Sequence, residues 1–204
     1  MVALKPPEVY NSIIMINKKF LSQIKKDLET YQAERNQIIN TSRDILQASK
    51  SAIFALHRGD IAEAGKSLGA AENLIAKLNK AYNKNNRLRF EGSYKASLEE
   101  YVESKIFFQF LAGKNLDKLP IESIGPEEYI NGLTDLTGEL VRQAVLQATK
   151  GNYKVLAGYC SFTEEVVGFM LTLYLTGSSR QKFDDAKRNL KRLEQIIYEV
   201  KIHG

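Results

Sequence analysis

Residues 13–58 decide the fold, and they read IIMINKKFLSQIKKDLETYQAERNQIINTSRDILQASKSAIFALHR. Apolar side chains recur along this stretch at the spacing of one helix face, and neither glycine nor proline interrupts them. The recurring apolar residues are Ile13, Ile16, Phe20, Ile24, Leu28, Tyr31, Ile38, Ile45, Ile53 and Leu56. The stretch therefore predicts one helix of about 45 residues, which at 1.5 Å per residue is about 65 Å long.

A helix of this length is longer than a chain of 204 residues can cover with its own core. We therefore expect the uncovered part to contact other helices in an oligomer. The alternative is a break near Asn36 or Thr41, which would give two shorter helices.

The rest of the chain is also predicted to be helical. Gly59 fits the turn after the first helix, and Asp60 begins a second helix with a D-x-x-E capping box that ends at Glu63. After a polar loop at 83–87, further helices are expected from 93 to 112, from 126 to 150, from 153 to 176 and from 179 to 202. A break near 161–163 in the fifth helix is an open alternative. The predicted fold is all-α, a single domain over 1–204 built as an elongated antiparallel bundle of about six to seven helices.

The composition is that of an ordinary globular protein, with 44% hydrophobic and 26% charged residues. No run of 18 apolar residues occurs, so no membrane span is expected. Pro6, Pro7 and Glu8 interrupt any signal-peptide pattern, and a single cysteine, Cys160, fits a reducing compartment. We therefore expect a cytoplasmic protein. The net charge of +5 is compatible with nucleic-acid binding without establishing it.

Two acidic clusters lie on separate predicted helices, EYVE at 100–103 and DLTGE at 135–139. Glu100 and Glu103 are three residues apart, and Asp135 and Glu139 are four apart, so each pair lies on one helix face. The flanking residues are apolar, which sets these carboxylates close to a core, where an ionised group is costly unless it is paired. If the two helices face each other, four carboxylates converge and the arrangement calls for a metal ion.

A solvated helix face is the alternative, because amphipathic helices often carry glutamates at this spacing. Glu99 and Lys105 are themselves expected to lie in solvent. If a metal binds, hard oxygen ligands with no nearby histidine select Mg²⁺ or Mn²⁺. Neither histidine of the chain lies in a Glu-x-x-His spacing with the clusters, which counts against a ferritin-like di-iron bundle.

Several segments resemble the translin/TRAX family. SRDI at 42–45 and IFALHR at 53–58 look like its N-terminal signature. EYVE at 100–103 resembles the Glu-Phe/Tyr-Val-Glu motif of the TRAX branch, and GLTDLTGELVR at 132–142 resembles another segment of that branch. The last helix also fits the family, so the resemblance runs from about residue 30 to the C-terminus. The compact chain resembles prokaryotic, archaeal TRAX-like members.

The resemblance implies an all-α subunit that assembles into a hollow, barrel-like octamer. It also implies that the TRAX branch supplies a Mg²⁺- or Mn²⁺-dependent endoribonuclease site, which faces the interior and here comprises Glu100, Glu103, Asp135 and Glu139. A chain that carries all four acids is expected to assemble alone, as a homo-octamer.

We expect Glu100, Glu103 and Asp135 to bind metal directly, whereas Glu139 either binds metal or orients the attacking water. Whether one or two ions bind stays open. Arg142 shares the helix face of Glu139, where it either contacts the scissile phosphate or forms an ion pair with Glu139.

His57 and Arg58 end the family-like N-terminal segment and are predicted to contact RNA. For Arg58, an interaction with the C-terminal dipole of the first helix is the alternative. The basic residues of the last helix are predicted to form a solvated face; they are Arg180, Lys182, Lys187, Arg188, Lys191 and Arg192.

The first hypothesis for function is a metal-dependent endoribonuclease that cleaves single-stranded RNA, or unpaired parts of RNA duplexes, inside a homo-oligomer. The second is a translin-like scaffold that binds RNA or single-stranded DNA without cleaving it. The four acids distinguish the two, because a pure binder gains nothing from negative charge that faces phosphate. A di-metal oxidase or a purely structural bundle is the third, disfavoured by the missing histidines.

Overall fold

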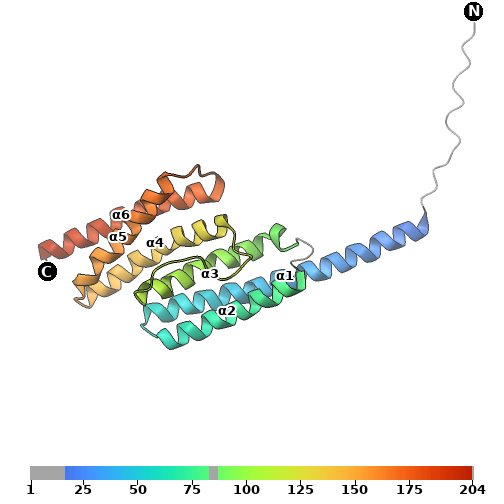
Figure 1. The fold of residues 1–204 in the computed structure, drawn as a ribbon, viewed down its shortest axis with the longest axis horizontal. Coiled ribbons are helices and arrows are strands. Elements are labelled where there is room, and N and C mark those ends of the chain that lie inside the picture. Colours follow the sequence, from blue (N-terminus) through green and yellow to red (C-terminus); the bar gives the residue numbers. More distant parts are fainter. Residues whose placement is uncertain (1–16, 83–86, 204) are drawn as a thin grey trace, which may run out of the picture. The chain divides into compact units, whose positions relative to one another are not determined.

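The computed structural model describes residues 17–82 and 87–203, and its described part holds six α-helices and no strand (Figure 1). The helices are α1 Lys18–His57, α2 Ile61–Tyr82, α3 Gly92–Leu111, α4 Pro126–Thr149, α5 Leu156–Leu171 and α6 Gly177–His203. The predicted all-α class with a long first helix is confirmed. The predicted start of that helix at Ile13, the loop residues 83–86 and Gly204 lie outside the described residues. No described helix combines the length and the apolar character that crossing a bilayer requires.

The first helix, α1, is 40 residues long and continuous, so the alternative of a break near Asn36 or Thr41 is wrong. Residue contacts divide the chain into two units, residues 1–37 and residues 38–204. Within the second unit, α1 buries one face whose members recur every three or four residues. They are Ile38, Ser42, Ile45, Ser49, Ala52 and Leu56. The apolar members of this face belong to one hydrophobic core with residues of α2, α3 and α4.

Gly59 and Asp60 form the turn from α1 into α2. Gly59 has a φ of 79°, in the left-handed region that a residue without a Cβ enters at little cost. Asp60 caps α2, because its Oδ1 accepts a hydrogen bond from the backbone N–H of Glu63 at 3.0 Å. The predicted turn and the Asp60 cap are confirmed, but the backbone N–H of Asp60 donates to the carbonyl of Ala55 at 3.0 Å. The Glu63 half of the predicted capping box is therefore not formed.

Gly132 lets α3 and α4 approach closely. A Cβ added at Gly132 would lie 2.6 Å from the backbone oxygen of Glu99 and 2.7 Å from the Cβ of Val102. Both distances are well inside van der Waals contact, so only glycine lets the two backbones come this near. Because Asp135 follows Gly132 by about one turn, this approach brings the acids of α3 beside those of α4.

The central helix of the second unit is α4, which packs against α3, α5 and α6. It begins as predicted, with Pro126 in its first turn and the carboxylate of Glu128 accepting a hydrogen bond from the Gly125 N–H at 3.0 Å. Leu136 and Leu140 of α4 are fully buried. Packing on several sides therefore fixes the helix that carries Asp135 and Glu139.

The fifth helix differs from its prediction in two respects. A short 3₁₀ turn precedes α5, which ends at Leu171 instead of continuing to the predicted residue 176. It also runs through 161–163 without a break, so the open alternative of a break there is wrong. The buried hydroxyl of Thr163 finds a partner within the helix, donating to the carbonyl of Tyr159 at 2.9 Å.

Candidate functional site

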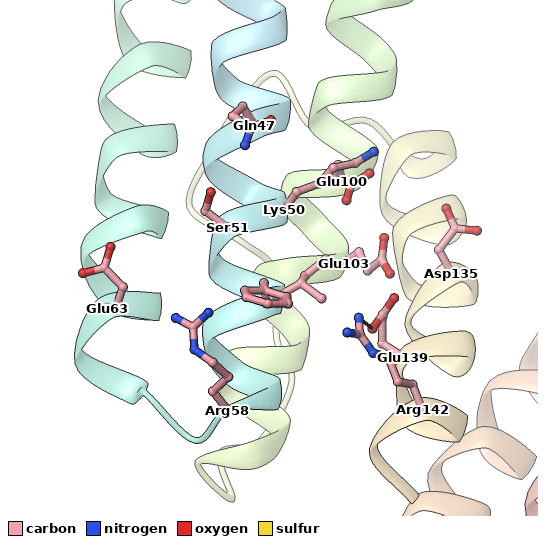
Figure 2. Close-up of a pocket in the computed structure, with 12 residues that line it drawn as sticks. Gln47, Lys50, Ser51, Arg58, Glu63, Glu100, Glu103, Asp135, Glu139 and Arg142 are labelled. Atoms are coloured by element: carbon pink, nitrogen blue, oxygen red, sulfur yellow. Dashed lines mark ion pairs between the residues drawn. The ribbon is translucent and has the colours of Figure 1, made fainter. Parts of the chain in front are cut away.

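A cleft of about 830 Å³ lies among α1, α2, α3 and α4 (Figure 2). All four acids predicted from the sequence line it, Glu100 and Glu103 from α3 and Asp135 and Glu139 from α4. The other lining residues are Gln47, Lys50, Ser51, Ile53, Phe54, Arg58, Glu63 and Arg142. The expectation that the two acidic helices face a common space is therefore met by the geometry.

Glu103 is the most buried of the four acids, with 8% of the residue exposed. Burial, followed by the negative charges of Glu100, Asp135 and Glu139, raises the pKa of Glu103 to about 9, although Lys182 opposes the shift. Near pH 7 this carboxyl therefore keeps a proton unless a cation replaces it. The alternative of a solvated face is wrong for Glu103.

The pKa values of Glu100 and Asp135 are raised as well, in both cases first by burial. Lys50 of α1 opposes the shift at Glu100, and Lys182 of α6 opposes it at Asp135. Three of the four acids are thus less stable as free carboxylates than they would be in water. Their ionised forms need positive charge from another source.

Lys182 belongs to this site although the sequence placed it on a solvated face. Its Nζ donates to the carboxylate of Asp135 and to Oε2 of Glu99, the latter at 3.0 Å. Burial lowers the pKa of Lys182, but the hydrogen bonds to the two carboxylates outweigh burial and raise it above its ordinary value. Asn131 donates to Oε1 of Glu99 at 3.0 Å and accepts from Ser179 at 2.8 Å. The predicted solvent positions of Glu99 and Lys182 are wrong, because the two side chains pair with each other and stay only 21% and 23% exposed.

His57 does not line the cleft but lies buried next to Glu139. Its Nε2 contacts the carboxylate of Glu139, and its Nδ1 is 2.9 Å from Oε1 of Gln143. Its ring packs on Phe107 with the ring centroids 5.1 Å apart, and 3% of the side chain is exposed. Both ring nitrogens of His57 are therefore engaged within the protein in this structure, and its contact with RNA stays a prediction. The expectation that no histidine lies near the acids is wrong, because His57 contacts Glu139.

The two predicted arginines both line the cleft. Arg142 lies 3.7 Å from Glu139, so the expected i,i+3 ion pair forms, while half of the arginine side chain stays exposed. Arg58 directly follows α1, and its guanidinium carbon lies 4.6 Å from the centroid of the Phe54 ring. Both guanidinium groups are therefore in a position to meet a phosphate in the cleft.

Residues 17–82 and 87–203 contain no group of three or more His, Cys, Asp or Glu side chains already arranged around one metal position. Asp135 is held by Lys182, and Glu139 is held by His57 and Arg142. The donor set itself fits a hard divalent cation, since four carboxylates line one cleft and Glu103 requires a proton or a cation. Cation binding by Asp135 would require this carboxylate to exchange its ion pair with Lys182 for the metal.

The sequence matches one protein family and is similar to several known proteins. The sequence model of the Translin family matches residues 33–204. Translin-associated protein X of Rattus norvegicus is 23% identical over 236 residues, an alignment that covers 95% of this chain and 80% of that protein. Translin of Gallus gallus is 33% identical over 79 residues, which cover 38% of this chain and about a third (34%) of that protein.

Solved structures share the fold. The crystal structure of apo-NeC3PO has a TM-score of 0.81 at 21% identity, over 91% of this chain and 98% of that one. The structure of AfC3PO in complex with duplex RNA has a TM-score of 0.80 at 24% identity, over 89% of this chain and 96% of that one. The helical architecture is therefore that of these proteins across nearly the whole described chain.

Proposed function

The chain belongs to the Translin family, and on that basis we propose that it is a Mg²⁺- or Mn²⁺-dependent endoribonuclease. It hydrolyses phosphodiester bonds in single-stranded RNA, or in unpaired parts of RNA duplexes, at the cleft that the four acids line. It works as a hollow homo-octamer with this cleft facing the interior.

One observation carries the proposal: Glu103 is buried among three other carboxylates, and its pKa is raised to about 9. A site that only bound RNA would gain nothing from these groups, because carboxylates repel the phosphates of the backbone. Perturbed carboxylates that converge in a cleft are instead typical of sites that do chemistry. This argument favours cleavage over simple binding.

Glu100, Glu103 and Asp135 would hold the divalent cation. When bound, the cation would act as a Lewis acid on the phosphodiester and lower the pKa of a water molecule. To hold the cation, Asp135 would exchange its ion pair with Lys182, and Lys182 would still have Glu99 as a partner.

Glu139 acts on the attacking water. His57 and Arg142 hold its carboxylate, and this support fixes the orientation in which it accepts the proton of the water. The water oxygen then bonds to phosphorus, the bond from phosphorus to the leaving ribose oxygen breaks, and that oxygen takes up a proton from solvent to become a hydroxyl group. Arg142, half exposed beside Glu139, stabilises the charge that develops on the phosphate.

RNA as the ligand is supported by the relative AfC3PO, whose structure was determined with duplex RNA. The cleft of this chain offers the matching charges, since Lys50, Arg58 and Arg142 line it. Cations at the rim of an acidic site let a phosphate backbone approach despite the carboxylates.

A non-cleaving scaffold that binds RNA or single-stranded DNA is the second candidate. It is favoured by one observation, namely that the described acids are not already arranged around a single metal position. Incubation of the protein with end-labelled single-stranded RNA, in Mn²⁺ or in EDTA, decides between the two. We expect shortened products in Mn²⁺ and intact RNA in EDTA; RNA that is bound but intact in both would establish the scaffold.

A further inference from the structure

One face of α1 and the residue that follows it carries a polar and aromatic stripe along the cleft. Gln47, Lys50, Ser51, Phe54 and Arg58 are spaced by three, one, three and four residues, which places them on one side of the helix. All five line the cleft that also contains the acids. Figure 2 shows Lys50 and Arg58 on the α1 side of this cleft. Each of these cations is four residues, about one turn, from Phe54.

Phe54 is the aromatic member of this stripe, and 53% of the residue is exposed. Its neighbours are buried, with Ile53 at 5%, Ala55 at 0% and Leu56 at 1%. The buried neighbours fix the backbone, so the Phe54 ring is held at the cleft without being covered by the rest of the described unit. An aromatic face left in water is a favourable surface for another flat apolar group.

The guanidinium group of Arg58 lies against the Phe54 ring and is a second flat group at this position. Its guanidinium carbon lies 4.6 Å from the Phe54 ring centroid, within the range of a cation–π contact. Among the ion pairs of the described residues, none includes Arg58, so the charge of Arg58 is not consumed by a carboxylate. Aromatic rings and guanidinium planes are the groups on which proteins stack unpaired bases.

We propose that Phe54 and Arg58 form a stacking subsite for one unpaired RNA base, with Lys50 contacting the neighbouring phosphate. The inference rests on the proposed function and names the residues that would make it require unpaired RNA. A base inside a continuous duplex has both faces covered by adjacent base pairs, so only an unpaired nucleotide can stack here. Because every base has a π face, the subsite selects unpaired structure and not sequence.

The test uses single-stranded RNA that carries the fluorescent base 2-aminopurine, with the metal chelated so that no cleavage occurs. Stacking of 2-aminopurine on Phe54 should quench its emission in the wild-type protein. Phe54→Ala should abolish the quenching and weaken RNA affinity by roughly 5- to 150-fold, the range for loss of one stacked base. Phe54→Tyr keeps the ring and should restore both signals.

Phe169→Ala is the matched control, because Phe169 is a phenylalanine of similar exposure, 48%, on α5 and outside the cleft. It should leave quenching and affinity at the wild-type level. Arg58→Gln should weaken binding and lower the slope of log affinity against log salt by about one. Blunt RNA duplex, with every base paired, should bind Phe54→Ala and wild-type protein equally.

The outcomes separate the subsite from the enzyme. Wild-type protein that cleaves RNA in Mn²⁺, while Phe54→Ala and Phe169→Ala bind RNA equally, would overturn the stacking subsite and leave the proposed function standing. Wild-type protein that binds RNA with quenching but never cleaves would overturn the proposed enzyme and leave the subsite in place. A change in oligomer mass on Phe54→Ala would show that a second copy of the chain covers the ring, which also overturns the subsite.

Discussion

Lys182 of α6 forms an ion pair with Asp135 of α4, and the same ammonium group is hydrogen-bonded to Glu99 of α3. Lys182 therefore links three helices at the edge of the acid cluster. It also supplies positive charge to Asp135, which is a metal ligand in the proposed mechanism. Lys182 and the cation are thus expected to compete for Asp135.

Lys182→Met should lower the stability of the metal-free protein and raise its affinity for Mn²⁺. Without the ammonium, two partly buried carboxylates lose their partner, which costs about 1–3 kcal/mol. At Asp135 the cation then no longer has to displace the ammonium group of Lys182, and it is repelled by less positive charge. Thermal unfolding in EDTA and calorimetric titration with Mn²⁺ measure the two effects.

Lys187→Met is the control, because it removes an ion pair with the equally accessible Asp184 on the same helix. It should change neither the stability nor the Mn²⁺ affinity by much. Unaltered Mn²⁺ affinity in Lys182→Met would contradict the competition.

The stability of the metal-free protein should fall as pH rises from about 5 to 9. Because burial and three neighbouring charges raise the pKa of Glu103 from 4.5 to about 9, the folded state binds a proton that the unfolded state releases. The stabilising contribution of that proton is complete below the unfolded pKa and is lost as pH rises through the folded pKa, with a slope of up to about 1.4 kcal/mol per pH unit.

Glu103→Gln removes this titrating group, so its stability curve in EDTA should be flatter over the same pH range. Denaturant unfolding at several pH values provides the measurement. The control is Glu165→Gln, because Glu165 is an exposed residue of α5. Parallel curves for wild-type protein and Glu103→Gln would show that the carboxyl of Glu103 is ionised at pH 7.

Gly132→Ala should separate α3 from α4 and damage the site. The new Cβ would meet the Glu99 oxygen and the Val102 side chain below 3 Å, so the backbones must move, at a cost of about 1–3 kcal/mol. Gly168→Ala on α5 is the contrasting change, because no atom lies within 4 Å of its added Cβ. It should be neutral or stabilise the helix by up to about 1 kcal/mol. Comparable melting temperatures for the two variants would refute the close approach.

His57→Gln should lower cleavage by roughly 10- to 100-fold without weakening RNA binding, since His57 holds Glu139 and does not line the cleft. Single-turnover cleavage and filter binding give the two values. Arg58→Gln should show the reverse pattern, with weaker binding and a smaller effect on the cleavage step at saturating protein. Loss of RNA affinity in His57→Gln, with structure intact, would support the direct RNA contact predicted for this residue.

Light scattering at micromolar concentration should give the mass of about eight subunits, as the family resemblance implies. Residues 18–37 of α1 offer apolar groups for such an assembly, since Phe20, Ile24, Leu28 and Tyr31 are each 45% or more exposed within the described chain. Their spacing of three or four residues forms one stripe. Leu28→Glu should therefore reduce the mass, whereas Lys25→Glu should not. A wild-type mass of one or two subunits would contradict the octamer.

Much of the fold followed from local patterns. The unbroken periodicity of the first helix, the Gly59-Asp60 turn and the Pro126 start of α4 are set by neighbouring residues, and each formed as predicted. The end of α5 at Leu171 did not follow from the sequence, because apolar residues continue beyond it at Leu173 and Leu175.

The acids of the site were predictable because three- and four-residue spacings place them on two helix faces. Lys182 and His57 were not, since both reach the site from elements distant in the sequence. A signal for Lys182 was present: Ser179, Phe183 and Ala186 are buried at helical spacing, which puts Lys182 beside the inner face of α6. For His57, only the packing of Phe107 and Gln143 around its ring explains its inward position.

The most direct test of the central claim is the rate at which Glu103→Gln cleaves labelled single-stranded RNA in Mn²⁺, compared with wild-type protein. The substitution keeps the shape of the side chain and removes its charge. We predict a loss of about 100-fold or more, because a group that helps to hold the cation is gone. RNA affinity in EDTA should stay equal, since without metal the Glu103 carboxyl is protonated and glutamine matches it in charge and shape. A folded Glu103→Gln protein that cleaves at near wild-type rate would contradict the account and move the active site away from these acids.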